Sequence, residues 1–409
     1  MSKTVDAAVA QEVPRWPMAQ LGHIAHVSTG SADVQDANEG AYPFFVRSAD
    51  IRSLTHFTHD TEAVLTAGDG NVGEIFHHYK GKFAAHQRVY VLEPGKNLAG
   101  RYLYYAMRSL FKSSLKGNTA KSTVDSLRRP MLTSFRLPLP PKNEQTAIAD
   151  YLDHETAEID VFISDQMALI ELLNERRLSA IDSRLMASGS TRTPLKHLGR
   201  LRSGITLGAK YDQETEVYPY LRVANVQTDH IDLDDIATAE VPKNVAESNR
   251  LLAGDVLMTE GGDRDKLGRG ALWKGEIEGM LHQNHVFAFT PNARLSAAYL
   301  VYVLESSTAR YYFDVTAKQS TNLASTNSTL VKGFQVPHWD IGTQHAIVES
   351  LDAECTALHE AISDAKKAIA LSQERRAALI ASAVTGQIDV TQRHRPVAEQ
   401  LEDEVLETV

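Results

Sequence analysis

The chain has 409 residues, of which 43% are hydrophobic, and a formal net charge of −10 at pH 7. This length allows two or three domains, no apolar run approaches the ~20 residues of a membrane span, and the N-terminus lacks a signal-peptide core, so we expect a cytoplasmic protein with no membrane partner. The acidic balance disfavours a general nucleic-acid binder, which is usually basic, but it permits DNA binding through local basic patches.

The first globular segment covers residues 1–141, of which residues 1–13 are small and polar and are expected to form a loose tail. Short apolar or alternating runs bounded by Gly, Pro, Asn and Asp predict strands, and the stretch that follows them has helical spacing. The expected strands are 23–30, 42–51, 63–70, 73–79 and 88–94, and the expected helix is 101–115. This segment is therefore predicted to be a mixed α/β domain.

A long helix is predicted next, over residues 142–187. It follows the sequence PLPP, which marks its start, and it contains no Gly or Pro. Apolar residues recur in two rows with a spacing of seven, as in a coiled coil. The residues expected to pair with another helix are Leu152, Ile159, Ile163, Ile170 and Leu173.

The second globular segment, residues 191–340, repeats the first in outline. YPYLRVANV, from Tyr218, resembles YPFFVRSADI, from Tyr42, and His282-Gln283 resembles His86-Gln87 before a strand. The match is weak outside such short stretches. Two domains of one architecture with different surface residues are typical of two binding modules of different specificity, although ordinary divergence of a duplicated domain gives the same picture.

A second long helix is predicted over residues 341–386, followed by an acidic tail, 387–409. Its single cysteine, Cys355, lies in an apolar row and is expected to be a small core residue, so no disulfide is predicted. The residues expected to pair with the first helix are Leu351, Leu358, Ile362, Ile369 and Leu379.

The two helical stretches are copies of each other, because residues 138–181 align with residues 337–380 without a gap. Neither helix can bury its apolar stripe alone, but the two can bury theirs against each other. We therefore predict an α+β fold with two similar domains and two long helices that pair as an antiparallel coiled coil with an approximate two-fold axis. Two ordinary amphipathic core helices remain the alternative.

Motifs that would indicate an enzyme are missing from the sequence. It contains no Walker nucleotide motif, no Asn-Pro-Pro-aromatic tetrapeptide of amino-methyltransferases and no Glu-x-Lys triplet of nucleases. His282 and His285 are a weak metal candidate without a matching Cys or acidic partner. No catalytic, cofactor-binding or metal-binding residue is therefore predicted.

Two pairs of loops are the candidates for contact with DNA. The Gly-rich loops, 67–73 and 260–270, could hold phosphate through backbone N–H groups, and the polar loops before the helices, 115–130 and 317–330, carry side chains that bond phosphates and base edges. Hairpin turns and solvated loops are the plain alternatives. The residues expected against DNA are Lys121, Ser122, Arg264, Lys266, Arg269, Gln319 and Asn322.

The helical repeat resembles the conserved regions of the specificity subunit of type I restriction–modification enzymes. The resemblance lies in the pattern P-L-P-P-x-x-E-Q from Pro138, in the E-R-R triplets and in the ending QERRAALIASAVTGQIDV, and it extends over the whole order of domain, helix, domain, helix. One departure is the opening of the second helix, PHWDIGTQ. The resemblance implies two target-recognition domains, each reading one half of a bipartite, non-palindromic site in double-stranded DNA.

The same resemblance implies a chain without catalysis of its own. The helices would dock two methyltransferase subunits, which use S-adenosylmethionine, and these would bring restriction/translocase subunits, which use ATP and Mg²⁺. The alternatives are a non-catalytic coiled-coil scaffold, a DNA-binding protein that works without a restriction partner, and an enzyme, which would need a catalytic constellation.

Overall fold

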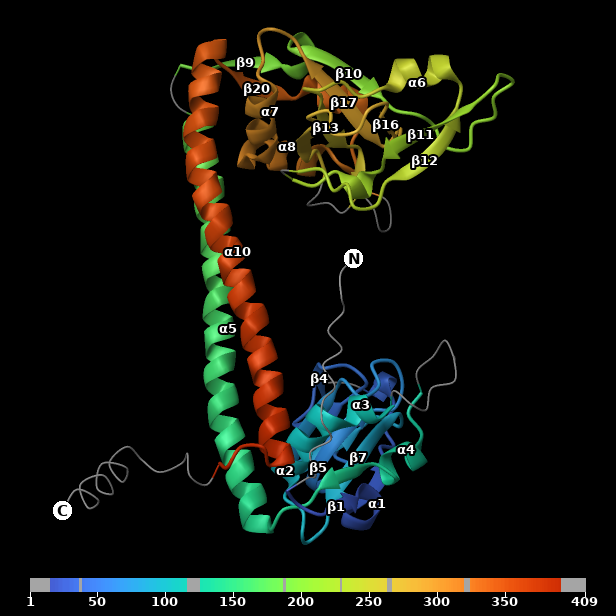
Figure 1. Ribbon diagram of the computed structural model, residues 1–409, viewed down its shortest axis with the longest axis vertical. Helices are drawn as coiled ribbons and strands as arrows, with labels where there is room; N and C mark the ends of the chain where they lie inside the picture. Colours follow the sequence, from blue (N-terminus) through green and yellow to red (C-terminus); the bar gives the residue numbers. More distant parts are fainter. Residues whose placement is uncertain are drawn as a thin grey trace, which may run out of the picture. The chain divides into compact units, whose positions relative to one another are not determined.

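The computed structural model describes residues 15–36, 39–115, 126–186, 189–228, 230–262, 267–319 and 324–390. The chain divides into two compact units, which are Met1–Gln166 with Lys367–Val409, and Met167–Lys366. Each unit holds one β-sheet domain and part of each long helix, α5 (Lys142–Leu185) and α10 (Ile341–Thr385) (Figure 1). The predicted α+β fold with two similar domains and two long helices is therefore confirmed.

The first unit is built on a six-stranded sheet in the order β2-β7-β5-β6-β3-β4. Its strands are β2 (Ala25–Thr29), β3 (Tyr42–Phe45), β4 (Ile51–Leu54), β5 (His59–Ala67), β6 (Phe76–Ala85) and β7 (Val89–Pro94). The central strand β5 is covered on both faces: Val64 packs in the cluster that includes the helices, and Leu65 packs in the cluster on the other face. A short pair, β1 (Met18–Gln20) with β8 (Arg136–Pro138), closes the domain next to α5.

The helices of the first domain depart from the prediction in two places. The strand expected from residue 23 begins at Ala25, because Leu21–Ile24 forms one helical turn, α1, that buries Leu21 completely. The helix expected at 101–115 is α2 (Gly100–Ala106), a π-helical turn at Met107–Phe111 and α3 (Lys112–Leu115). Short helices η1 (Val34–Asp36) and α4 (Arg129–Thr133) complete the domain.

The second unit repeats the core of this arrangement with smaller sheets, ordered β10-β17-β13-β15, β12-β11-β16 and β14-β19-β18. Its strands are β9 (Thr191–Pro194), β10 (Gly199–Ser203), β11 (Glu216–Leu221), β12 (Ala237–Val241), β13 (Val256–Thr259), β14 (Gly261–Gly262), β15 (Gly270–Leu272), β16 (Leu281–His282), β17 (Val286–Pro291), β18 (Lys318–Gln319), β19 (Ala324–Ser325) and β20 (Gln335–His338). Its short helices are η3 (Leu195–His197), η4 (Val223–Asn225), α6 (Lys243–Asn249), α7 (Ala297–Glu305), α8 (Ser307–Thr316) and α9 (Ser328–Gly333).

Strand pairing shows which positions of the two domains correspond. The parallel pair β3 and β6 aligns Phe45 with Ala85, and the parallel pair β11 and β16 aligns Leu221 with His282. His282 therefore corresponds to Ala85, and Gln283 corresponds to His86. The similarity of His86-Gln87 to His282-Gln283 in the sequence is thus misplaced by one residue, since the next strand begins four residues after Ala85 in one domain and four residues after His282 in the other.

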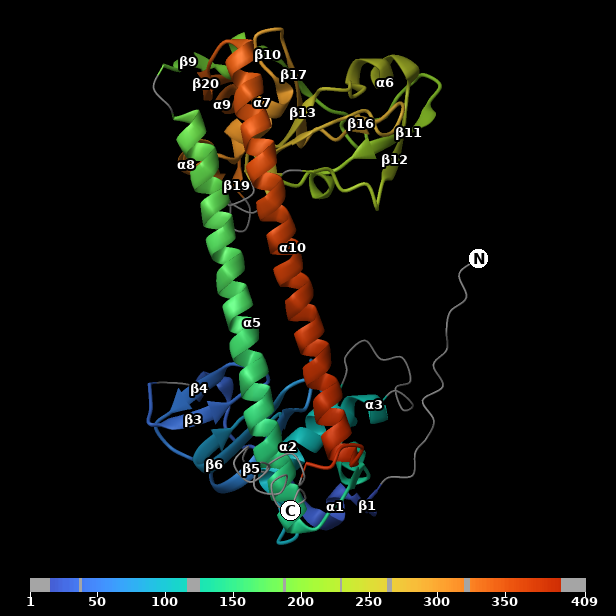
Figure 2. The same ribbon diagram turned by 60° about the vertical axis from the view of Figure 1, so that its left-hand side comes forward.

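Within each unit the two long helices pack in antiparallel directions (Figure 2). In the first unit, Ile148 and Leu152 of α5 share a core with Ile380 and Val384 of α10. In the second unit, Ile181 and Leu185 of α5 share a core with Leu351 and Cys355 of α10. The residues predicted to pair are all buried or half-buried, namely Leu152, Ile159, Ile163, Ile170, Leu173, Leu351, Leu358, Ile362, Ile369 and Leu379.

Charged pairs flank these packed rows. Arg376 lies 2.9 Å from Asp160 in the first unit, and Arg184 lies 3.0 Å from Glu354 in the second. Among the residues for which the structure is described, no helix is long and apolar enough to cross a membrane.

Candidate nucleic-acid interface

Each domain is attached to the start of its long helix by a buried glutamine. In the first unit, the Gln145 side chain donates hydrogen bonds to the carbonyls of Asn97 and Pro140, at 2.9 and 2.8 Å, and accepts one from the Ala99 N–H at 2.8 Å. Gln145 is completely buried. These bonds fix the first turn of α5 against the loop that leads into α2.

The second unit repeats this attachment with the matching glutamine. Gln344 donates to the carbonyls of Arg294 and Trp339, at 2.8 and 2.9 Å, and accepts from the Ser296 N–H at 2.8 Å. The contact is kept although α10 opens with a different sequence, and Asp340 caps this helix through a 3.0 Å bond from the Thr343 N–H. The Thr343 hydroxyl, which donates to the same carboxylate, and the bond from the Thr343 N–H together lower the pKa of Asp340.

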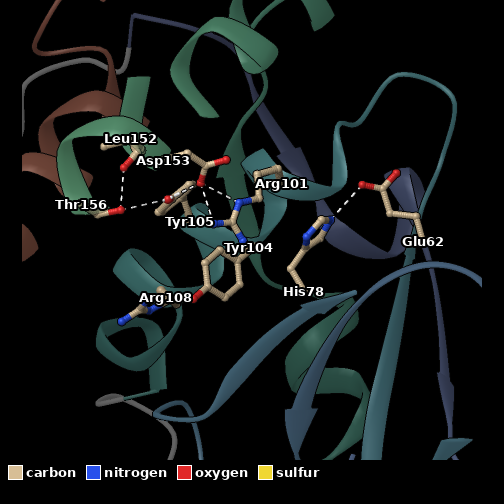
Figure 3. A network of polar contacts seen from close by, with 9 residues as sticks. All are labelled: Glu62, His78, Arg101, Tyr104, Tyr105, Arg108, Leu152, Asp153 and Thr156. Carbon is tan, nitrogen blue, oxygen red and sulfur yellow. Dashed lines mark hydrogen bonds and ion pairs between the residues drawn. The ribbon is translucent and has the colours of Figure 1, made fainter. Parts of the chain in front are cut away.

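A second contact joins the domain to the next turns of the helix (Figure 3). In the first unit, Asp153 accepts hydrogen bonds from Arg101 at 2.7 Å and from the Tyr105 hydroxyl at 2.6 Å. Burial, together with the Asp153 carboxylate, raises the pKa of Tyr105 to about 12. The second unit keeps the tyrosine and the carboxylate, since Tyr302 donates to Asp352 at 2.7 Å. Three side chains, a glutamine, a tyrosine and an aspartate, are therefore repeated and hold both domains on their helices in the same way.

The Gly-rich loop and the polar loop, which are far apart in the sequence, meet in each unit. In the first unit, the Leu127 N–H donates to the Gly68 carbonyl at 2.8 Å, and Asp69 bridges to Ser126. In the second unit, the Thr326 N–H donates to the Glu260 carbonyl at 2.8 Å, and β14 pairs with β19. Both domains thus build one surface from the same two loops, at the end of β5 or β13.

The first of these surfaces carries a net positive cluster. Arg88 and Arg47 donate hydrogen bonds to the two oxygens of Asp69, at 2.7 and 3.1 Å. Burial opposes ionisation of Asp69, but the two hydrogen-bonded guanidinium groups lower the pKa of its carboxyl overall. The two cations remain largely open to solvent, with Arg88 62% exposed. One carboxylate therefore holds two guanidinium groups in fixed orientation at the surface.

The second surface has different chemistry at the corresponding positions. The registers of β7 and β17 align Arg88 with His285, and His285 lies 2.9 Å from Glu260. The loop of the second domain then passes Arg269, which lines a cavity of about 390 Å³ together with Arg310 and Tyr311 of α8. The same backbone frame thus presents an arginine pair in one domain and a histidine, arginines and a tyrosine in the other.

The predicted DNA-contacting residues fall partly beyond this description. Lys121, Ser122, Arg264, Lys266 and Asn322 lie outside the described residues. Gln319 belongs to β18, which lies within the stretch 317–330, and Arg269 is half-buried at the cavity.

Sequence reasoning did not identify Arg47, Asp69 and Arg88 as a site. The available signal was a basic residue two positions after β3, another directly before β7, and an aspartate in the Gly-rich loop. The pairing of these strands in space was needed to connect them.

The histidines of the HQNH stretch do not form a metal site. His282 is fully buried, and its Nδ1 lies 2.6 Å from the Val286 carbonyl. Burial lowers the pKa of His282 to about 4, so the ring is neutral near pH 7. In the part of the chain that the structure describes, no group of three or more His, Cys, Asp or Glu side chains could hold a metal ion.

Residues 15–163 match the family model described as type I restriction modification DNA specificity domain. The type I restriction enzyme EcoDI specificity subunit of Escherichia coli is 36% identical over 146 residues, which are 36% of this chain and 32% of that protein. The EcoKI specificity subunit of Escherichia coli strain K12 is 24% identical over 184 residues, 41% of this chain and 39% of that protein.

These matches span about a third to two-fifths of the length of the curated relatives. The fold extends further. A solved chain from work on complex assembly and conformational transition of the type I R-M system aligns with 92% of this chain and 100% of its own length, at a TM-score of 0.60 and 13% identity. At this identity the likeness concerns the fold alone.

Proposed function

We propose that the chain is a specificity subunit of a type I restriction–modification system, which its match over residues 15–163 supports, and that it is a non-catalytic subunit that recognises a bipartite, non-palindromic site in double-stranded DNA. Each domain reads one half of the site through the surface formed by its Gly-rich loop and its polar loop.

The observation that carries this proposal is the repeated loop pairing with unlike side chains. The bonds from Leu127 to Gly68 and from Thr326 to Glu260 build the same frame twice. Arg47 and Arg88 in one frame, and His285 and Arg269 in the other, are groups that bond phosphates and base edges. The same backbone arrangement with different side chains supports two domains that recognise different DNA sequences.

The partners and cofactors follow from the same assignment. The paired helices are the proposed docking element for two methyltransferase subunits, which use S-adenosylmethionine, and restriction/translocase subunits with ATP and Mg²⁺ join the assembly through them. In such an assembly this chain works in the cytoplasm, where its DNA lies, and contributes recognition but no cofactor site.

Selection from a pool of random duplexes with the purified full chain tests the proposal. The expected result is a consensus of two defined blocks separated by unspecified bases. A single block, or no enrichment above a scrambled pool, would favour the scaffold without DNA recognition.

The role of the first reading surface is tested by Arg88→Ala on the selected duplex. If Arg88 meets phosphate, the slope of log affinity against log salt falls by about 0.9, the value of one contact. If it reads a base, one position of one block relaxes at a cost of roughly 1–3 kcal/mol. The matched control is Lys96→Ala, an exposed cation just beyond the opposite end of β7, which leaves affinity and salt slope unchanged.

The second surface is tested in parallel with Arg269→Ala, which acts on the other block only. Unchanged affinity and salt slope in both Arg88→Ala and Arg269→Ala would place the loops away from DNA and leave them as hairpin turns.

A further inference from the structure

A second polar cavity lies in the second unit, away from the paired loops. Its volume is about 700 Å³, and it opens between the start of β10 and the end of α6. The polar side chains that line it include Lys196, His197, Arg200, Arg202, Glu247 and Arg250. Four of these six are permanent cations, and Glu247 is the one carboxylate among the described residues of the lining.

At the base of this cavity, the positive charge of Arg202 is neutralised by a buried carboxylate, and hydrogen bonds hold the guanidinium group in place. Arg202 pairs with Asp255, which is completely buried, and also donates to the Arg250 carbonyl at 2.7 Å. The other oxygen of Asp255 accepts a hydrogen bond from Thr290 at 2.5 Å. Because both carboxylate oxygens are used inside the base, Asp255 does not neutralise the cations at the rim.

The rim cations are Lys196 and Arg200, which are both exposed. Across the residues that the structure describes, neither forms an ion pair, whereas Arg250 is 3.4 Å from Glu278. With Arg202 and Arg250 paired, the cavity holds the two cations Lys196 and Arg200 against the one carboxylate of Glu247, so its lining has a net positive charge. A concave surface with a net charge concentrates the electric field and favours a ligand of the opposite sign.

The first domain shows that the fold does not require these cations. The strand registers align Ala25 of the first domain with Gly199 of the second, and Pro94 with Pro291. These alignments identify the residues of the first domain that correspond to the cavity lining. The first domain has Gly22 for Lys196, His26 for Arg200, Ser28 for Arg202 and Glu93 for Thr290. The same backbone is thus formed with a neutral and acidic set, which makes the basic cavity a property of the second domain and not of the architecture.

This cavity is also separate from the proposed reading surface of the same domain. Asp255, in its base, directly precedes β13, whereas Glu260 and the Gly-rich loop follow the last residue of that strand. The two features lie at opposite ends of one strand, so a ligand in the cavity leaves the reading loops accessible.

We propose that the cavity is a binding site for a phosphate-bearing ligand, held by Lys196 and Arg200 over the fixed guanidinium of Arg202. Lysine and arginine side chains are the usual ligands of phosphate, and the volume accommodates a di- or triphosphate group. Two sources share this chemistry: a free nucleotide, and the backbone of DNA outside the half-site. The proposal does not depend on sequence recognition by the loops.

The test substitutes the residues that the first domain carries at the same positions, Lys196→Gly together with Arg200→His, in the full chain. The control is Lys332→Gln with Lys366→Gln, which removes two exposed lysines elsewhere in the same unit. Inorganic tripolyphosphate, ATP without metal, and a duplex lacking the recognition site are titrated by calorimetry at low salt. Circular dichroism melts check that the variants fold.

The expected result is saturable tripolyphosphate binding that weakens at least tenfold in Lys196→Gly/Arg200→His and stays unchanged in the control. A parallel loss of ATP binding identifies a nucleotide as the source, and a parallel loss of duplex binding with a lower salt slope identifies the DNA backbone. Three results overturn the proposal: no saturable binding of tripolyphosphate, equal weakening in the control, or loss of tripolyphosphate binding with ATP and duplex binding both unchanged.

Discussion

Replacement of Gln145 by alanine tests how each domain is held on its helix. The substitution removes three hydrogen bonds and leaves the Pro140 carbonyl and the Ala99 N–H without partners in a buried place. An unsatisfied buried group costs about 1–3 kcal/mol, while water can replace the bond to Asn97, which is exposed. We therefore expect the free energy of unfolding of the first unit to fall by about 3 kcal/mol.

Two measurements locate this effect. Thermal melting of the full chain is expected to move the transition of the first unit down by about 6–12 °C, from ~2–4 °C per kcal/mol at this size. Hydrogen–deuterium exchange, which resolves the two units where a single transition does not, is expected to show faster exchange of the Ala99 amide. The matched control is Gln166→Ala on the same helix, because within the described residues the half-buried Gln166 side chain forms no hydrogen bond.

The repeat supplies a second control in the same molecule. Gln344→Ala is expected to accelerate exchange at the Ser296 amide and to leave Ala99 unchanged. The costs of the two substitutions are expected to add in the double variant, because the sites share no partner. A loss below ~0.5 kcal/mol for Gln145→Ala, or a loss equal to that of Gln166→Ala, would refute the reasoning, since the buried groups would then have other partners.

Three further predictions concern pH, the helix pair and the separation of the readers. Burial lowers the pKa of His282 to about 4 in the folded chain, below its unfolded value, so its contribution to stability is complete above pH 6.5 and about 3 kcal/mol of it is lost as the pH falls towards 4. Urea unfolding at pH 7 and 4.5 is expected to show a smaller change in the free energy of unfolding for His282→Asn than for the natural chain. An equal change would contradict this prediction. Ile163→Asp is expected to destabilise the helix pair, because it places a charge in the half-buried row. The control Val161→Asp, at a residue that is 62% exposed, is expected to change the melting temperature little. Equal shifts of the melting temperature would argue against pairing at this row. Exchange of residues 194–337 for the same segment of another specificity subunit is expected to change one block of the selected DNA consensus, and a change in both blocks or in neither would disprove separable readers.

The sequence was sufficient for the helices because their information is local and periodic. Apolar residues at a spacing of seven predict a paired helix wherever the chain lies, and the gapless match of residues 138–181 with 337–380 predicts two equivalent helices. The fold class followed from this and from the alternation of short strands. The role of Gln145 was not visible, because its three partners are backbone groups that no side-chain pattern reveals.

The reading surface was predictable only in part, because it is assembled by strand pairing. The loops were identified by composition, and their meeting depends on which strands neighbour β5 and β13. Asp69 is 22 residues from Arg47 and 19 from Arg88, and no periodicity relates such positions. The π-helical turn at Met107–Phe111 was missed for a similar reason, since its residues have the spacing of an ordinary helix.

Each long helix begins in one unit and ends in the other, and this affects the order in which the chain can fold on the ribosome. The hydroxyl of Tyr102, in the first domain, lies 3.4 Å from the carbonyl of Val384, which is 282 residues later in the chain. Until the end of α10 is synthesised, the first domain lacks one wall of its core, and at ~5–20 residues per second that interval lasts roughly 10–60 s. The second unit, Met167–Lys366, is continuous in sequence and can close first. The N-terminal domain, although translated first, is therefore completed last, and during that interval its open core is a target for chaperones and proteases.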